Sequence, residues 1–125
     1  MLSYNSEIEF KSIKPYDKLW LEKFDEFVQS KLEDCNLTSF DISNEMLVSR
    51  IQLFRKTKLL TGLTPMKYVK KARLKTAYNL IHQYTYGTIK EVAHKVGFKD
   101  VKYFSRQFKS YFGESPSIIL RERLP

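Results

Sequence analysis

The feature that most constrains the fold of this chain is an internal repeat. The pattern Arg-x-x-Lys-x-x-x-Gly-x-(Thr/Ser)-Pro occurs over Arg55–Pro65 and again over Arg106–Pro116, at an offset of 51 residues. Further upstream, apolar positions such as Ile42 and Val92 match at an offset of 50. Self-similarity of this kind indicates that the chain folds as two copies of one small structural unit.

Each copy is predicted to form a short helix, a tight turn and a longer helix. In the second copy, Thr88 and Glu91 form a capping box that opens the short helix, and Gly97 supplies the left-handed residue that ends it. Asp100 then caps the longer helix, which ends at Gly113.

The first copy follows the same plan. A brief helix is predicted over Ile42–Leu47, Ser49 caps the longer helix, and Gly62 ends it. After each copy a hydroxyl residue precedes a proline, as in Thr64-Pro65, which is typical of the start of a new helix. The helix after the first copy is predicted over residues 65–84, and at 1.5 Å per residue it would be about 30 Å long.

These elements predict an all-α fold of about seven helices. An amphipathic helix over Lys18–Asp34 precedes the repeat. The predicted organisation is a short extended N-terminal arm or interdomain linker (1–16) and one domain (17–125), which holds a first helix-turn-helix unit (about 37–62), a linker helix (65–84) and a second helix-turn-helix unit (about 88–113).

The charges are divided unevenly along the chain, which has 22 basic and 14 acidic residues and a net charge of +8. Residues 1–45 hold five basic and ten acidic residues, whereas residues 46–125 hold 17 basic and four acidic ones. No acidic residue lies between Met46 and Lys90. An acidic leader before a strongly basic module indicates binding to a polyanion.

Other classes of protein are excluded by what the sequence lacks. No apolar run approaches the ~20 residues of a membrane span, so no membrane contact is expected. There is no secretory signal pattern, and the single cysteine, Cys35, fits a cytoplasmic protein. His82 and His94 have no partner at metal-ligand or catalytic spacing, and no glycine-rich phosphate loop occurs. No metal, cofactor or enzymatic activity is therefore predicted.

The predicted geometry of each copy is that of a helix-turn-helix, whose second helix can enter the major groove of DNA. The second helix of each copy is rich in Arg, Lys and Gln. Arginine and glutamine can each make two hydrogen bonds to a base edge, and lysine neutralises phosphate. The sequence therefore predicts sequence-specific binding of double-stranded DNA, with the two recognition helices in adjacent major-groove segments.

The chain also resembles a known family, the DNA-binding domain of bacterial AraC/XylS-type regulators. The resemblance covers about residues 37–122 and is carried by Val48–Lys56, Leu60–Pro65, Arg73–Lys75, Ile89–Phe98, Tyr103–Lys109 and Tyr111–Pro116. It implies transcription regulation through two helix-turn-helix units joined by a long helix.

The resemblance also implies which residues contact DNA. Base-reading positions and their neighbours in the two recognition helices make up the predicted DNA-binding set, which is Ser49, Arg50, Ile51, Gln52, Phe54, Arg55, Lys56, Lys99, Asp100, Val101, Lys102, Tyr103, Ser105, Arg106 and Lys109. Phe54 and Val101 are poor hydrogen-bonding groups, so these two either contact thymine methyl groups or pack within the fold.

Residues 7–36 resemble the arm and helix that precede this domain in hybrid two-component regulators. That resemblance implies an output domain of a larger regulator, with a sensor or receiver region upstream and RNA polymerase as a further partner. A free-standing short regulator stays open as an alternative. From the residues alone, a helical module that binds a protein through its acidic leader also stays open, while RNA binding is less favoured because no aromatic platform for stacking bases is evident.

Overall fold

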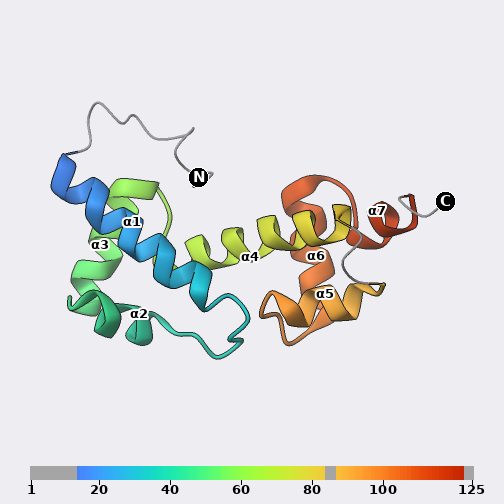
Figure 1. Ribbon diagram of the computed structural model, residues 1–125, viewed down its shortest axis with the longest axis horizontal. Helices are drawn as coiled ribbons and strands as arrows, with labels where there is room; N and C mark the ends of the chain where they lie inside the picture. The colour runs from blue at the N-terminus through green and yellow to red at the C-terminus, as the bar shows by residue number, and fades with distance from the viewer. Residues whose placement is uncertain (1–13, 84–86, 123–125) are drawn as a thin grey trace. The chain divides into compact units, whose positions relative to one another are not determined.

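The computed structural model describes residues 14–83 and 87–122, and the regular elements in these ranges are all α-helices (Figure 1). The seven described helices are α1 (Pro15–Ser30), α2 (Ser39–Met46), α3 (Arg50–Thr61), α4 (Pro65–His82), α5 (Ile89–Lys95), α6 (Val101–Phe112) and α7 (Pro116–Glu122). The predicted all-α fold of about seven helices is confirmed. Within the described residues, no helix is both long and apolar enough to cross a membrane.

Two helices near the N-terminus begin earlier than predicted. α1 begins at Pro15 rather than Lys18, because the fixed φ of proline suits the first turn of a helix, and it ends at Ser30. α2 begins at Ser39, since Thr38 and Asp41 form a capping box one turn before the predicted start. Of the predicted arm, residues 1–13 lie outside the described ranges, as does the end of the predicted linker helix at residue 84.

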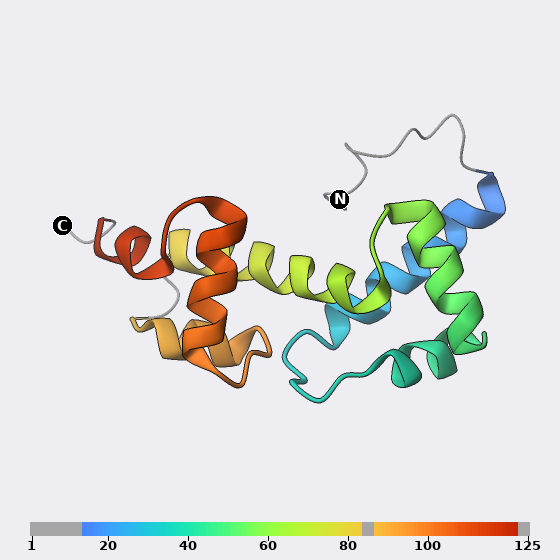
Figure 2. The same cartoon turned by 180° about the vertical axis from the view of Figure 1, so that it is seen from behind.

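The chain forms two compact units. Of the described residues, 14–31 and 37–69 form the N-terminal unit, and 32–36, 70–83 and 87–122 form the C-terminal unit. The helix pair α2–α3 lies in the first unit and α5–α6 in the second, and both pairs can be followed in Figure 2. α4 contributes residues 65–69 to the N-terminal unit and the rest of its length to the C-terminal unit.

The N-terminal unit packs α1, α2 and α3 around an aromatic core. The Phe24 side chain is completely buried, stacks on Trp20 with ring centroids 5.5 Å apart, and meets the edge of Tyr68 at 4.9 Å. Ile42 of α2 and Leu53 of α3 are also completely buried. The apolar stripe predicted for α1 is therefore a core-forming surface, and burial of each large side chain contributes roughly 1.5–3 kcal/mol.

A buried carboxylate connects α1 to α4 within the same unit. Asp25 is 2% exposed, and its Oδ1 accepts hydrogen bonds from the Tyr68 hydroxyl and, at 3.4 Å, from the Gln29 side-chain amide. Burying a polar group is costly unless hydrogen bonds replace its water. The Tyr68 hydroxyl therefore stabilises Asp25 and holds α1 against the first turns of α4.

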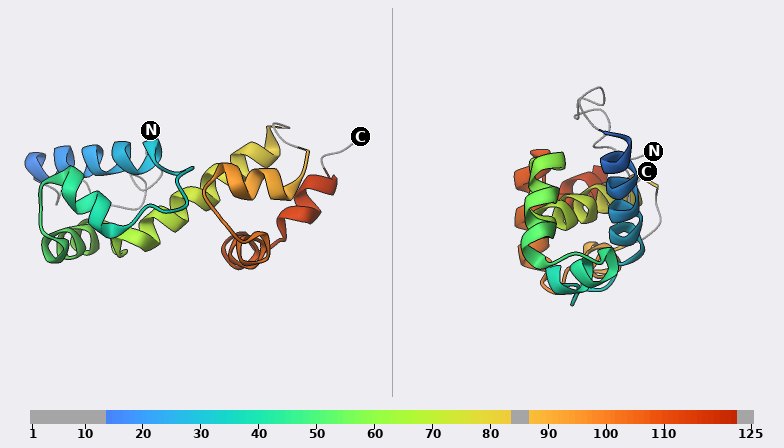
Figure 3. Two further views of the ribbon diagram at one scale, coloured as in Figure 1. Left: turned by 90° about the horizontal axis from the view of Figure 1, so that it is seen from below. Right: turned by 90° about the vertical axis from the view of Figure 1, so that its left-hand side faces the viewer.

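The C-terminal unit is built around a continuous series of aromatic rings. Phe98, Phe104, Phe108 and Phe112 follow one another with centroid separations of 5.0, 5.7 and 4.6 Å, and Tyr78 of α4 lies 4.7 Å from Phe112. Aromatic pairs at such separations stabilise a core beyond the area that they bury. Three of the rings lie on α6, which is seen end-on in the left view of Figure 3, with α5 above it in that view.

The loop over residues 32–36 is held on the C-terminal unit by Arg73 of α4. Arg73 Nε donates a hydrogen bond to the Leu32 carbonyl oxygen at 3.1 Å, and Nη2 donates one to the Asp34 carbonyl oxygen at 2.7 Å. Burial lowers the pKa of the Arg73 guanidinium, an effect that nearby Cys35 and Asp34 oppose. Hydrogen bonds from a charged donor are stronger than neutral ones, so this loop is firmly anchored.

The turns of the two helix-turn-helix units each contain a residue with left-handed backbone. Gly97, between α5 and α6, has a φ of 90°, and a Cβ there would lie 2.0 Å from the Leu32 carbonyl oxygen and 2.8 Å from Arg73 Nε. The equivalent residue between α2 and α3, at an offset of 50, is Leu47, with a φ of 57°. Its side chain is 89% exposed, so Leu47 retains the left-handed strain of about 1–2 kcal/mol without a buried contact to offset it.

These two turn residues are expected to respond to substitution in opposite ways. Leu47→Gly should raise the free energy of unfolding by about 0.5–1 kcal/mol, because it relieves strain and removes little packing. Gly97→Ala should lower it by more than about 3 kcal/mol, because both the backbone conformation and the Leu32 carbonyl oppose a Cβ. Urea unfolding followed by circular dichroism measures both changes, and a destabilised Leu47→Gly would contradict the assignment of strain to Leu47.

Candidate nucleic-acid interface

Three of the predicted DNA-binding residues cap the recognition helices. Ser49 Oγ accepts a hydrogen bond from the Gln52 amide at 3.1 Å, and Gln52 Oε1 accepts one from the Ser49 amide at 2.9 Å. Asp100 Oδ1 accepts hydrogen bonds from the amides of Lys102 and Tyr103 at 2.9 and 3.3 Å. These residues fix where α3 and α6 begin, and thus which of the following side chains share a face.

One side of α3 is buried and the opposite side exposes large side chains. Leu53 and Thr57 are completely buried. Ile51, Phe54, Arg55 and Lys58 are exposed, and their spacing of three and four residues places them on one face of the helix.

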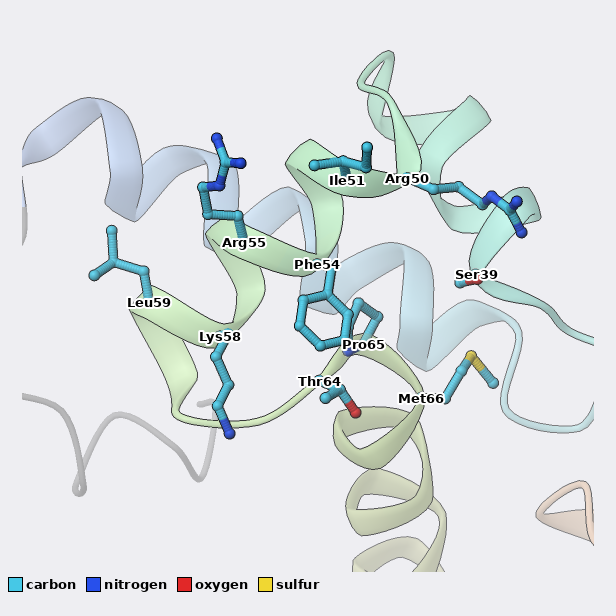
Figure 4. A pocket seen from close by; sticks show the side chains of 10 residues that line it. All are labelled: Ser39, Arg50, Ile51, Phe54, Arg55, Lys58, Leu59, Thr64, Pro65 and Met66. Carbon is cyan, nitrogen blue, oxygen red and sulfur yellow. The ribbon is translucent and has the colours of Figure 1, made fainter.

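An open groove, the α3 groove, runs along this face to the start of α4 (Figure 4). Its volume is about 960 Å³, and it is lined by Ser39, Arg50, Ile51, Phe54, Arg55, Lys58, Leu59, Thr64, Pro65 and Met66. Three of these ten residues are basic and none is acidic, so the groove favours a negatively charged ligand.

Parts of the α3 groove were not in the predicted set. Ser39 and Met66 come from α2 and α4, so no periodicity within α3 could point to them. Lys58 and Leu59 lie on α3 itself, and Leu59 is 79% exposed. The signal in the sequence was that Leu59 is apolar and, at helical spacing, does not share a face with Leu53 and Thr57.

Lys56 lies on another side of α3, against α1. Its Nζ is 3.3 Å from Asp17 Oδ1 and lies over two rings, 4.5 Å from the centroid of Tyr16 and 5.1 Å from that of Trp20. An ammonium group at these distances is attracted both by the carboxylate and by the ring faces. Lys56 therefore stabilises the packing of α1 on α3.

α6 exposes a polar stripe opposite the buried Phe104 and Phe108. Lys102, Arg106 and Lys109 are exposed on this helix. The guanidinium carbon of Arg106 lies 5.8 Å from the centroid of the Tyr103 ring, which is within the range of a cation–π interaction. This contact restricts the Arg106 side chain before any ligand binds.

The remaining predicted residues have different environments. Arg50 and Lys99 are exposed at or just before the starts of α3 and α6, and Ser105 is partly buried. Val101 is also partly buried and packs on the core of the C-terminal unit, which favours the packing role over the thymine contact that the sequence left open. The predicted residues that stay exposed thus fall into two sets, one on or just before each recognition helix.

Comparison with known proteins identifies the family. A family model described as "Helix-turn-helix domain" matches residues 42–122. The fold is similar to that of a transcriptional regulator from Chromobacterium violaceum, whose structure is described as AraC-type DNA-binding domain-containing, with a TM-score of 0.78, 26% identity, and coverage of 88% of this chain and 96% of that one. The chain belongs to the AraC-type helix-turn-helix family.

Two other matches come from proteins with signalling names. The C-terminal domain of AraT, a response regulator from Geobacillus stearothermophilus, has a TM-score of 0.77 at 25% identity and covers 91% of this chain and 90% of that one. A Formosa agariphila protein named Histidine kinase P4 is 36% identical over 112 residues, or 90% of this chain. The match spans only 8% of that protein's length.

The placement of Lys56 leads to a test of its role. Lys56→Ala is expected to lower the free energy of unfolding by about 1 kcal/mol, because it removes a partly buried ion pair and a cation–π contact. Lys58→Ala is the matched control, since Lys58 is exposed on the same helix, and should change stability by less than about 0.5 kcal/mol. Equal changes in urea unfolding would show that the contact with α1 contributes nothing specific.

Proposed function

We propose that this chain binds double-stranded DNA sequence-specifically to regulate transcription, with α3 and α6 as recognition helices. The observation that carries the proposal is the repeated placement of exposed cations on the second helix of each unit. Arg55 and Lys58 of α3 correspond, at an offset of 51, to Arg106 and Lys109 of α6, and all four are exposed. Membership of the AraC-type family supports the same function.

The charge of the two helices favours this function over ordinary solvation. The exposed face of a soluble helix usually mixes both signs of charge, but neither α3 nor α6 contains an acidic residue. Clustered cations repel one another until a polyanion neutralises them and releases its counterions. DNA phosphates provide that neutralisation along both helices.

The side chains divide into two roles. Arg55 and Arg106 each carry a planar fork of donors that matches O6 and N7 of guanine in the major groove. Lys58, Lys102 and Lys109 are suited to phosphate, which needs a flexible point charge rather than a fixed geometry. The contact with Tyr103 reduces the conformational entropy that Arg106 loses on binding.

The domain is proposed to serve as the output of a longer regulator. A receiver or sensor region upstream would control it, and its DNA-bound form would contact RNA polymerase in the cytoplasm. The similarity to the C-terminal domain of a response regulator, and the match within a much longer protein named as a histidine kinase, support this organisation.

Fluorescence anisotropy with promoter-length duplexes tests the proposed activity. Binding is expected at low salt, and log affinity should fall linearly with log salt, by about 0.9 for each phosphate neutralised. Absence of binding to any duplex at low salt would contradict the proposal.

Replacing the two arginines tests their assignment to bases. Arg55→Ala and Arg106→Ala are each expected to weaken binding to a selected site by about 1–3 kcal/mol while weakening binding to random DNA much less. Lys23→Ala, at an exposed position of α1, is the control and should leave both affinities nearly unchanged. Equal losses on selected and random DNA would instead assign the two arginines to phosphates.

A further inference from the structure

The two recognition helices carry different chemistry at equivalent positions. The outer stripe of α3 consists of Ile51, Phe54, Arg55 and Lys58, and the residues at an offset of 51 on α6 are Lys102, Ser105, Arg106 and Lys109. The last two positions are basic in both helices. The first two positions hold large apolar side chains in α3 but polar side chains in α6. The two helices are therefore equivalent in sequence position but differ in the polarity of their exposed surfaces.

The fold does not require these apolar side chains. Ile51 is 70% exposed and Phe54 is 53% exposed, so neither belongs to the core. α6 keeps the same length of 12 residues and the same glycine stop with polar residues at both positions. Two large apolar groups held in water on a basic helix are therefore better explained by a ligand than by folding.

The surroundings of this apolar pair restrict what the ligand can be. Figure 4 shows Phe54 in the middle of the α3 groove, between Ile51 and Thr64, and Arg55 and Lys58 line the same groove. The ligand must be apolar where it meets Ile51 and Phe54 and negatively charged around that contact, because no acidic residue lines the groove. In the major groove of DNA, the C5 methyl group of thymine is the apolar feature of the base edges, and phosphates flank it.

We propose that Ile51 and Phe54 read thymine by contact with its C5 methyl group. In this way α3 adds apolar selection of thymines to the hydrogen bonds of Arg55, while α6 has polar side chains at the equivalent positions. This inference rests on the proposed DNA-binding function and adds the chemical basis of sequence preference in the first unit. Burying one methyl group favours binding by about fourfold in Kd.

Replacement of thymine by deoxyuracil tests the inference, because the two bases differ only by the C5 methyl group. Duplexes that bind the 125-residue chain are first selected from a random pool, and each thymine is then replaced singly. We expect Kd to rise about fourfold at one or two thymines. In the Ile51→Ala and Phe54→Ala variants, this sensitivity should disappear at the thymine that each side chain contacts.

A matched control separates methyl recognition from a general loss of apolar surface. Leu19→Ala removes an apolar side chain that is 53% exposed on α1 and does not line the α3 groove, and it should keep the full sensitivity to deoxyuracil. Since Ile51 and Phe54 are exposed, their truncation should leave the thermal unfolding midpoint of the chain nearly unchanged, which circular dichroism checks.

The outcomes separate this inference from the proposed function. Tight binding that no deoxyuracil substitution weakens, or a sensitivity that persists in both variants, would overturn methyl recognition and leave DNA binding intact. Variants that lose affinity equally for thymine and deoxyuracil duplexes would also overturn it, and would assign the two side chains to a DNA contact other than the methyl group. Variants that bind both duplexes as the unsubstituted chain does would overturn it as well, and would point to a protein partner for the patch. Failure to bind any duplex would overturn the proposed function together with the inference.

Discussion

The left-handed residue in the turn between two helices is the constraint on which each unit depends. It reverses the chain within a few residues, so the second helix can cross the first and turn its outer face to solvent. At Gly97 this constraint is enforced twice, by the φ of 90° and by the Leu32 carbonyl that occupies the space of a Cβ. At Leu47 the same backbone is reached at the cost of strain. Neighbouring atoms therefore enforce the left-handed conformation of the second turn, whereas in the first turn this conformation depends on the backbone alone.

The two units share a fold but expose different surfaces, because different residues supply the buried side and the outer side of each recognition helix. Leu53 in α3 and Phe104 in α6 occupy equivalent buried positions, and both are completely buried. The exposed positions beside them carry no packing requirement, so Ile51 and Lys102 can differ without a change in the helix. Duplication of a unit with this property allows one stable fold to present two kinds of DNA contact.

Much of the fold could be predicted from the sequence, because helix ends depend on interactions between residues that are close together in the chain. The capping residues Thr88, Ser49 and Asp100 and the stops Gly62 and Gly113 set helix ends through hydrogen bonds and backbone conformation within a few residues. The site was less predictable, because exposure depends on distant elements. The contact of Lys56 with α1 could not be predicted from spacing within α3. Ser39 and Met66 also reach the α3 groove from other helices, about which the periodicity of α3 carries no information.

The most direct test of the central claim, that both units read DNA, is the sequence recovered when duplexes bound by the chain are selected from a random pool. We expect a site with two separate blocks of specified bases, since α3 and α6 each expose an arginine suited to a base edge. Replacement of Arg55 by alanine should relax one block and leave the other, and replacement of Arg106 should do the reverse. Recovery of no enriched sequence, or of one block that neither replacement alters, would contradict the account.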